Sequence, residues 1–320
     1  MTTLQVPGRR LASGSGKAAD RLFRGGSGLA AYAVIGILIL LAAMLTLSSA
    51  EALAHIGIVE FITGTTWDPV NRIFGALPYI IGTLLSAAIA LVIATPIALL
   101  TAIYLAELAP RRVAIPLTFL VELIAAVPSV VIGLWGVFVL TPFLKLTVES
   151  FFVSTLGGSI SIFEGPPLGI GLFAAGVILA IMILPTIVSV SREVITSVPM
   201  AQREAMFALG ATRWEVVTKA VLPAARSGLA GAVILGLGRA LGETMAVTMV
   251  IGNAQDIPTS LFDQSQTIAS KIATTFNEAS VGLQTSSLIA LGLILLVMTI
   301  GLNIVARLLV WRVAGAVGTE

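Results

Sequence analysis

Residues 77–105 read LPYIIGTLLSAAIALVIATPIALLTAIYL and contain no charged side chain. A helix needs about 20 mostly apolar residues to cross the hydrocarbon core of a bilayer, and this stretch exceeds that length. It is also too long for a buried strand. The stretch therefore predicts a membrane-spanning helix.

Five more apolar stretches of this kind follow the same rule, at approximately residues 29–50, 116–141, 168–190, 227–252 and 285–308. Of the 320 residues, 57% are hydrophobic and 11% are charged, whereas about a quarter of the residues in a soluble domain are charged. A soluble core of this size cannot cover so much apolar surface, so lipid must cover it. We expect an all-α, polytopic transmembrane bundle of six spans.

Three prolines lie inside or near the ends of predicted spans, at Pro96, Pro128 and Pro185. Each removes a helical hydrogen bond and tends to kink its helix. Two interpretations stay open: simple packing geometry, or bent helices that line a cavity.

Lysine and arginine divide unequally between the two sides that six spans define. Positive residues accumulate on the cytoplasmic side of membrane proteins, so both termini are expected in the cytoplasm. Fourteen lie on the side of the termini (Arg9, Arg10, Lys17, Arg21, Arg24, Arg111, Arg112, Arg192, Arg203, Arg213, Lys219, Arg226, Arg307 and Arg312), three lie on the other side (Arg72, Lys145 and Lys271), and Arg239 lies inside a span.

The chain is expected to hold two regions. Residues 1–28, rich in Gly, Ser and Arg, predict a flexible basic cytoplasmic tail near anionic lipid. Residues 29–320 predict a single six-span domain, whose longest inner loop covers 191–226. The outer loops are expected at 51–76, 142–167 and 253–284.

Within the last outer loop, Ile268, Ile272 and Phe276 are spaced as on one face of a helix. They predict a short amphipathic helix lying on the outer surface.

The chain contains few of the residue types that catalytic and metal sites use. The chain has no cysteine and one histidine, His55, which excludes disulfides, thiolate zinc sites and cysteine nucleophiles. We expect no catalytic residue, no metal site and no cofactor, and we expect His55 to be an ordinary surface residue. A membrane-embedded enzyme is therefore disfavoured.

The inner loop 191–226 has the pattern of two helices separated by a glycine. Good helix formers run from Ala201 to Leu209, and Gly210 supplies the left-handed residue that ends such a helix. Thr212 and Glu215 match a capping box at the start of a second helix, and Pro223 is expected to end it. The apolar side chains Met206, Phe207, Leu209 and Trp214 are expected to be exposed and to fit a groove on another protein.

This loop resembles the EAA loop of ABC import permeases. The resemblance rests on Glu204-Ala205, on Gly210 five residues later, and on Leu222-Pro223 twelve residues after the glycine. Many members have alanine where this chain has Met206. The resemblance implies an ABC type I importer permease fold, and it implies that Glu204, Ala205, Met206, Gly210 and Trp214 contact a partner ATPase, which hydrolyses the ATP.

The fifth predicted span carries two charges, Arg239 and Glu243. Four residues apart on one helix, they would share a face, and each costs about 2.5–3.5 kcal/mol inside a membrane. Two interpretations stay open. The pair neutralises itself and holds helices together, or Arg239 lines a path and offers its planar fork to an oxyanion, with Glu243 keeping the empty site neutral.

Three segments resemble the phosphate-specific (Pst) permeases of bacteria: residues 122–136 (ELIAAVPSVVIGLWG), 238–247 (GRALGETMAV) and 266–270 (QTIAS). The likeness covers roughly residues 75–312. The long 142–167 loop and the Thr244-Met245-Ala246-Val247 run look more like the PstC type than the PstA type. The resemblance implies a multi-pass protein of the bacterial cell membrane that forms half of the translocation pathway for inorganic phosphate.

The same resemblance implies the partners: a second, PstA-like permease, a PstB-like ATPase dimer and an extracytoplasmic, PstS-like phosphate-binding protein, with no nucleic acid. Three alternatives remain: the PstA-type partner itself, a permease for sulfate or molybdate, or a secondary anion transporter. The last explains the spans but leaves the EAA-like loop without a role, and it predicts inverted repeats that the sequence does not show.

Overall fold

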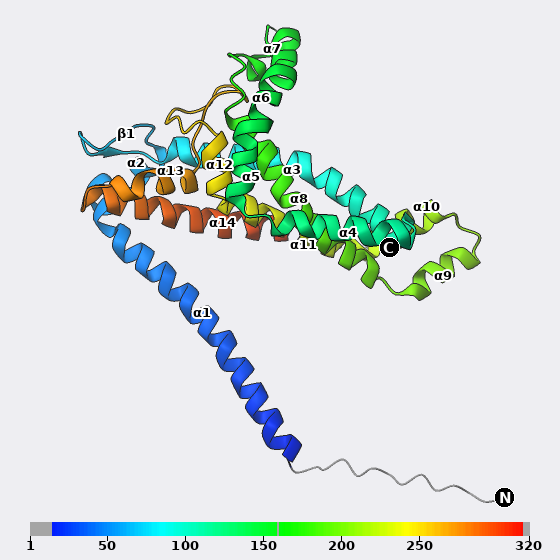
Figure 1. Ribbon diagram of the computed structural model, residues 1–320. Helices are drawn as coiled ribbons and strands as arrows, with labels where there is room; N and C mark the ends of the chain where they lie inside the picture. Colours follow the sequence, from blue (N-terminus) through cyan, green and yellow to red (C-terminus); the bar gives the residue numbers. More distant parts are fainter. Residues whose placement is uncertain (1–14, 159, 316–320) are drawn as a thin grey trace, which may run out of the picture. The chain divides into compact units, whose positions relative to one another are not determined.

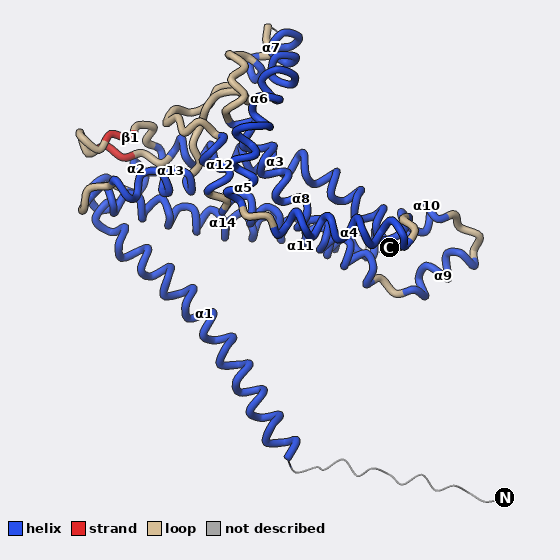
Figure 2. Tube along the Cα trace, viewed as in Figure 1, coloured by secondary structure: helices blue, strands red, loops and turns tan. Residues whose placement is uncertain are grey.

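The computed structural model describes residues 15–158 and 160–315. The chain forms two units that pack separately, Met1–Ser48 and Ser49–Glu320. Six helices of the described part are long and apolar enough to cross a membrane, which confirms the predicted all-helical, six-span class (Figures 1 and 2). These spans are Ala19–Ile56, Leu77–Leu108, Ser129–Leu156, Leu172–Thr196, Arg213–Gly242 and Leu283–Trp311.

The first unit consists of the larger part of α1 (Ser15–Ile56). Most side chains of α1 before Ser49 are exposed. The prediction of a flexible tail over 1–28 is wrong for residues 15–28, which are helical; residues 1–14 lie outside the described part. Alanine and leucine are good helix formers, and adding turns to an existing helix costs far less than starting a new one.

The second unit is built around α8 (Leu172–Ser197), the most buried span. Against it pack α3 (Leu77–Ile103) and α11 (Leu222–Gly242), and α14 (Leu283–Gly315) packs on α11 (Figure 1). Small residues let helices approach closely in membranes. Gly176 of α8 is one such residue, because an added Cβ would lie 2.4 Å from Ile89 Cγ2. The face of α3 in this core carries Ala87, Ala90, Ala94 and Ala98.

The third span differs from its predicted position of 116–141. α4 (Arg111–Ala126) ends before Pro128, and a new helix starts at Ser129. Val127 is extended, with ψ of 129°, because a residue before proline disfavours the helical region. The new helix rises away from the layer of α3, α8, α11 and α14 (Figure 1). It comprises α5 (Ser129–Trp135), η2 (Gly136–Leu140), α6 (Thr141–Phe143), η3 (Leu144–Glu149) and α7 (Ser150–Leu156).

Much of the predicted outer loop 142–167 is therefore helical. By contrast, Pro96 and Pro185 lie inside continuous helices, α3 and α8. Shorter elements complete the unit: α2 (Ile58–Thr63), η1 (Tyr104–Leu108), η4 (Ser161–Phe163), α9 (Met200–Ala208), α10 (Arg213–Val216), η5 (Val217–Val221), α12 (Met245–Val250), α13 (Ile268–Thr275) and η6 (Phe276–Glu278).

A small hairpin that the sequence analysis did not predict follows α2. Strands β1 (Trp67–Asp68) and β2 (Ile73–Phe74) pair antiparallel, with Trp67 opposite Phe74. Their rings meet edge to face with centroids 4.9 Å apart. Aromatic cross-strand pairs stabilise such short ribbons, so side-chain packing rather than strand length holds this hairpin.

The predicted helix of the last outer loop exists as α13, but its position is different. Ile268, Ser270 and Lys271 are buried, so α13 is packed into the unit instead of lying on its surface. The Ile268 N–H donates to Thr83 Oγ1 of α3 at 3.0 Å. The segment before α13 is also close to α3, because a Cβ on Gly82 would lie 2.3 Å from the Gln266 carbonyl oxygen.

Lys271 of α13 is a buried cation next to aromatic rings. It is 3% exposed, and its Nζ lies 5.0 Å from the Trp67 ring centroid and 5.3 Å from that of Tyr79. Burial lowers the pKa of Lys271 to about 8 from its ordinary 10.5. Between pH 8 and 10.5 the unfolded chain therefore binds more protons than the folded chain, so stability rises with pH over that window.

We expect Lys271→Met to stabilise the protein at pH 7. Removing the buried charge recovers about 3 kcal/mol, at about 1.4 kcal/mol per pKa unit, and loses cation–π contacts of about 1–2 kcal/mol. Thermal unfolding in detergent should show a higher Tm at pH 7, and the advantage should shrink as the pH rises through 8 to 10.5. A lower Tm at pH 7 would mean that the ring contacts outweigh desolvation.

Candidate functional site

The loop between the fourth and fifth spans folds as the predicted helix–glycine–helix hairpin, from α9 to α10. Gly210 has φ of 82°, in the left-handed region that favours glycine. The Ala211 N–H donates to the Met206 carbonyl at 3.1 Å, which satisfies a carbonyl at the end of α9. The capping box is confirmed: Thr212 Oγ1 accepts from the Glu215 N–H, and the Glu215 carboxylate accepts from the Thr212 N–H.

Large apolar side chains of this hairpin are exposed, as predicted. Those of Phe207, Leu209 and Trp214 are exposed by 45%, 84% and 72%. Glu204 and Ala205 are exposed as well. An apolar surface on a rigid, capped hairpin is suited to insertion into a groove of another protein.

Met206 differs from its prediction as an exposed apolar residue. It is half-buried and packs against the cluster that contains Ile195 and Val216. Its side chain therefore helps hold the hairpin to the bundle.

Pro223 does not end the second helix. Helical structure continues from α10 through η5 into α11, where Pro223 lies in the first turn. The π-helical η5 comes just before the proline. Wider turns of this kind accommodate irregularities in a helix, so the missing proline N–H leaves the fifth span continuous with the hairpin.

Arg203, within α9, is nearly fully buried at 8% exposure. Its Nη2 lies 2.6 Å from Glu107 Oε1, at the end of the second span. The same nitrogen donates to the Ile195 carbonyl at 2.9 Å, and Nη1 donates to the Val198 carbonyl. This buried arginine therefore fixes α9 to two spanning helices.

Arg239 lies near the end of α11 and is exposed on the surface of this single chain. Its Nη1 lies 3.4 Å from Thr186 Oγ1 of α8, a long hydrogen bond. A charged group in this part of a span is costly against lipid. We therefore expect the side chain to face water or another subunit.

Glu243 does not share a helical face with Arg239, contrary to the prediction. α11 ends at Gly242, and Glu243 is extended with ψ of 131°. Its Oε1 accepts a hydrogen bond from the Ala246 N–H at 3.4 Å, so the carboxylate caps the first turn of α12. Among the residues that the structure describes, no ion pair joins Arg239 to Glu243, and mutual neutralisation of the two is not observed.

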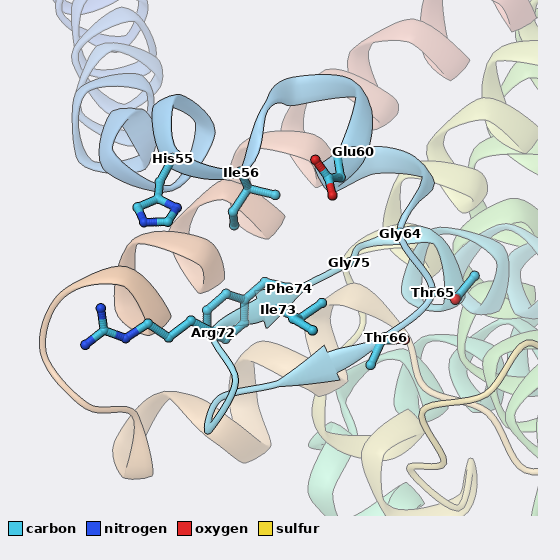
Figure 3. A pocket seen from close by; sticks show the side chains of 10 residues that line it. All are labelled: His55, Ile56, Glu60, Gly64, Thr65, Thr66, Arg72, Ile73, Phe74 and Gly75. Carbon is cyan, nitrogen blue, oxygen red and sulfur yellow. The ribbon is translucent and has the colours of Figure 1, made fainter.

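A separate pocket of about 280 Å³ lies beside the β1–β2 hairpin, at the end of the bundle away from α9 and α10 (Figures 1 and 3). His55 and Glu60 line its helical side, and Arg72 lines its hairpin side (Figure 3). His55 is exposed, in agreement with its prediction as a surface residue. The pocket does not include Arg239 or Glu243, so we assign it no part in a path through the bundle.

Three residues of this site were missed from the sequence: Glu107, Thr186 and Arg203. Arg203 directly precedes Glu204, and Glu107 is an acid at the end of an apolar span. These positions were a signal for an ion pair, but nothing in the spacing shows which base meets which acid. Thr186 gave no signal, since threonine is common in spans.

Comparison with known proteins agrees with this geometry. The family described as "Binding-protein-dependent transport system inner membrane component" matches residues 94–315. The phosphate transport system permease protein PstC of Mesorhizobium japonicum is 45% identical over 93% of this chain and 92% of that protein. PstC of Haemophilus influenzae is 45% identical over 92% of this chain and 93% of its own length. PstC 2 of Mycobacterium tuberculosis is 42% identical over 90% of each.

Solved structures share the fold. A bacterial alginate ABC transporter, crystallised with an alginate pentasaccharide-bound periplasmic protein, has a chain that aligns with a TM-score of 0.60 at 17% identity, over 93% of this chain and 97% of that chain. A second structure, of a bacterial ABC transporter that imports the acidic polysaccharide alginate, has a chain that aligns with a TM-score of 0.57 at 19% identity, over 92% of this chain and 98% of that chain. The six-span ABC permease fold and the sequence matches agree, and the chain belongs to the family of binding-protein-dependent transport system inner membrane components, among its PstC-type permeases.

Proposed function

We propose that this chain imports inorganic phosphate as one of the two permeases of an ATP-driven importer, forming half of the translocation path. The observation that carries the proposal is Arg239, a cation in a spanning helix that is exposed on the surface of the single chain and has no acidic partner among the described residues. Its planar fork of donors fits the oxygens of a tetrahedral oxyanion. Relatives 42–45% identical carry the name phosphate transport system permease.

The orientation follows from charge. With fourteen basic residues on the side of the termini and three on the other, the positive-inside rule places both termini and the α9–α10 hairpin in the cytoplasm. The β1–β2 hairpin and α13 then face outward.

The cytoplasmic hairpin docks on an ATPase subunit, which hydrolyses the ATP. Glu204, Ala205 and Trp214 contribute exposed contacts, Gly210 sets the angle between the helices, and Met206 supports the hairpin from within. The complete importer contains a PstA-like permease, a PstB-like ATPase dimer and a PstS-like phosphate-binding protein.

Arg239 and Glu243 line the path in this proposal. Arg239 binds the anion. Glu243, at the break between α11 and α12, adds a negative charge that lowers the net positive charge of the empty path without pairing directly with Arg239. A sulfate or molybdate permease is the nearest alternative, because the same guanidinium fits those anions.

The test is transport by the purified complex in lipid vesicles. We expect an ATPase to copurify with the chain, and we expect radiolabelled phosphate to accumulate only when ATP and the binding protein are present. Excess sulfate or molybdate should not compete. Competition by either anion would indicate that this anion is the substrate. ATP-independent uptake by the chain alone would indicate a secondary transporter and not an ATP-driven importer.

A further inference from the structure

Arg203 connects the hairpin to α8, the central helix of the bundle. Its guanidinium donates to the carbonyl of Ile195, in the last turn of α8, and to that of Val198, the residue directly after α8. The Ile195 carbonyl also accepts the Val198 N–H at 3.3 Å. The last carbonyls of a helix have no partner within the helix, and a cation is favourable at this negative end of the dipole. A side chain of α9 therefore completes the end of α8.

Glu107 neutralises the same guanidinium from the end of the second span. Its Oε1 accepts from Arg203 Nε at 3.2 Å and from Nη2 at 2.6 Å. The two side chains are 10% and 13% exposed, whereas the Glu215–Lys219 pair of the same loop region is 37% and 64% exposed. A buried pair is hard to separate, since separation leaves an uncompensated buried charge. α9, α8 and η1 are thus joined at one point.

The helix α8 extends this connection to the proposed substrate path. Thr186, which contacts Arg239, precedes Ile195 on the same unbroken helix. At 1.5 Å per residue the two positions are about 14 Å apart along the axis. This part of α8 contains the fully buried Ile187, Val188 and Ser191, and closely packed interiors transmit displacement with little deformation.

We infer that Arg203 is a positioning residue that makes α9 and α8 one rigid body. Movement of the docked hairpin then reaches Thr186 and Arg239 directly, with no hinge at Val198-Pro199. The inference rests on the proposed docking of this hairpin on an ATPase. It assigns to Arg203 and Glu107 the role of passing movement of the hairpin on to α8, a role separate from that of the exposed residues that contact the partner.

The experiment combines transport with a distance measurement in the assembled complex. The chain contains no cysteine, so Glu193→Cys on α8 and Gln202→Cys on α9 provide unique, exposed sites for spin labels in this subunit. We expect the same distance between the labels in the nucleotide-free and ATP-bound states. Glu107→Gln should broaden the distance distribution and lower phosphate uptake per ATP hydrolysed about tenfold, the size of effect expected from breaking one coupling contact.

Two further variants separate positioning from general stability. Lys219→Gln removes the exposed ion pair of the same loop region and should leave both the distance and the uptake ratio unchanged. Arg203→Lys keeps the charge, but a single ammonium cannot hydrogen-bond to Glu107 and to both carbonyls at once. Its label-distance distribution and its uptake per ATP hydrolysed should therefore lie between those of the wild type and those of Glu107→Gln. All comparisons are normalised to assembled complex.

A change of the label distance on ATP binding in the wild type would overturn the inference, because the joint would then be a hinge. An unchanged uptake ratio in Glu107→Gln would overturn it as well. Failure of the docking proposal gives a different result: no ATPase copurifies even with the wild type. The rigid connection between α8 and α9 is then tested in the isolated chain, in which Glu107→Gln must still broaden the distribution of distances between the two labels.

Discussion

Replacing Gly210 with valine is expected to abolish ATP-driven uptake while the chain still inserts into the membrane. Gly210 has φ of 82°, and an added Cβ would meet no atom within 4 Å. The cost is therefore conformational, about 1–2 kcal/mol for an L-residue in this region, and greater for a β-branched one. The hairpin can escape this strain by changing the angle between α9 and α10, which separates Phe207 from Trp214. We expect uptake to fall at least about tenfold, as for a 1.4 kcal/mol loss in coupling.

Gly282 provides a matched control for this change. It also has positive φ, 109°, with open space around the added Cβ, but it precedes α14, far from the hairpin in sequence. Gly282→Val should carry similar strain and keep ATP-driven uptake. Gly210→Asn should be mild, because asparagine tolerates the left-handed region. Cross-linking from position 214 to the ATPase measures docking directly. Undiminished cross-linking and uptake in Gly210→Val would contradict the coupling role of the hairpin.

The sequence predicted the elements that depend on local patterns. An uncharged stretch such as 77–105 has the length of a span whatever its neighbours are, and the Gly210 and Thr212 signals act within a few residues. The third span shows where this reasoning failed. Its hydropathy continues through Pro128, but the extended residue that proline imposes at Val127 divides it into two helices.

Contacts between distant segments could not be predicted. Glu107 and Arg203 are separated by 96 positions, and their meeting depends on how α8 packs against the second span. The prediction that Arg239 and Glu243 share a helical face was wrong for a local reason. Four-residue spacing implies a shared face only inside a continuous helix, and α11 ends at Gly242. The helix break itself was missed from the sequence.

Replacing Arg239 with glutamine is expected to stop phosphate uptake in complexes that assemble normally. No ion pair joins Arg239 to an acid among the described residues, and its contact with Thr186 is long. The substitution therefore leaves no carboxylate unpaired, and assembly should not suffer. If the guanidinium binds the anion, its loss should lower uptake about a hundredfold, since truncating one partner of a desolvated charge pair costs about 2–5 kcal/mol. Arg239→Lys should also impair uptake, because an ammonium cannot form the bidentate contact.

The double variant Arg239→Gln with Glu243→Gln decides between the two roles considered for Arg239. If the arginine served only to balance Glu243, the neutral pair would restore transport that the single change had removed. The helix break between them, with the Glu243 carboxylate accepting the Ala246 N–H, argues for the other result: the double variant should assemble and remain inactive. Uptake in vesicles, normalised to assembled complex, measures this for both single variants and the double. Full transport in the double variant would rule out an anion-binding role for Arg239.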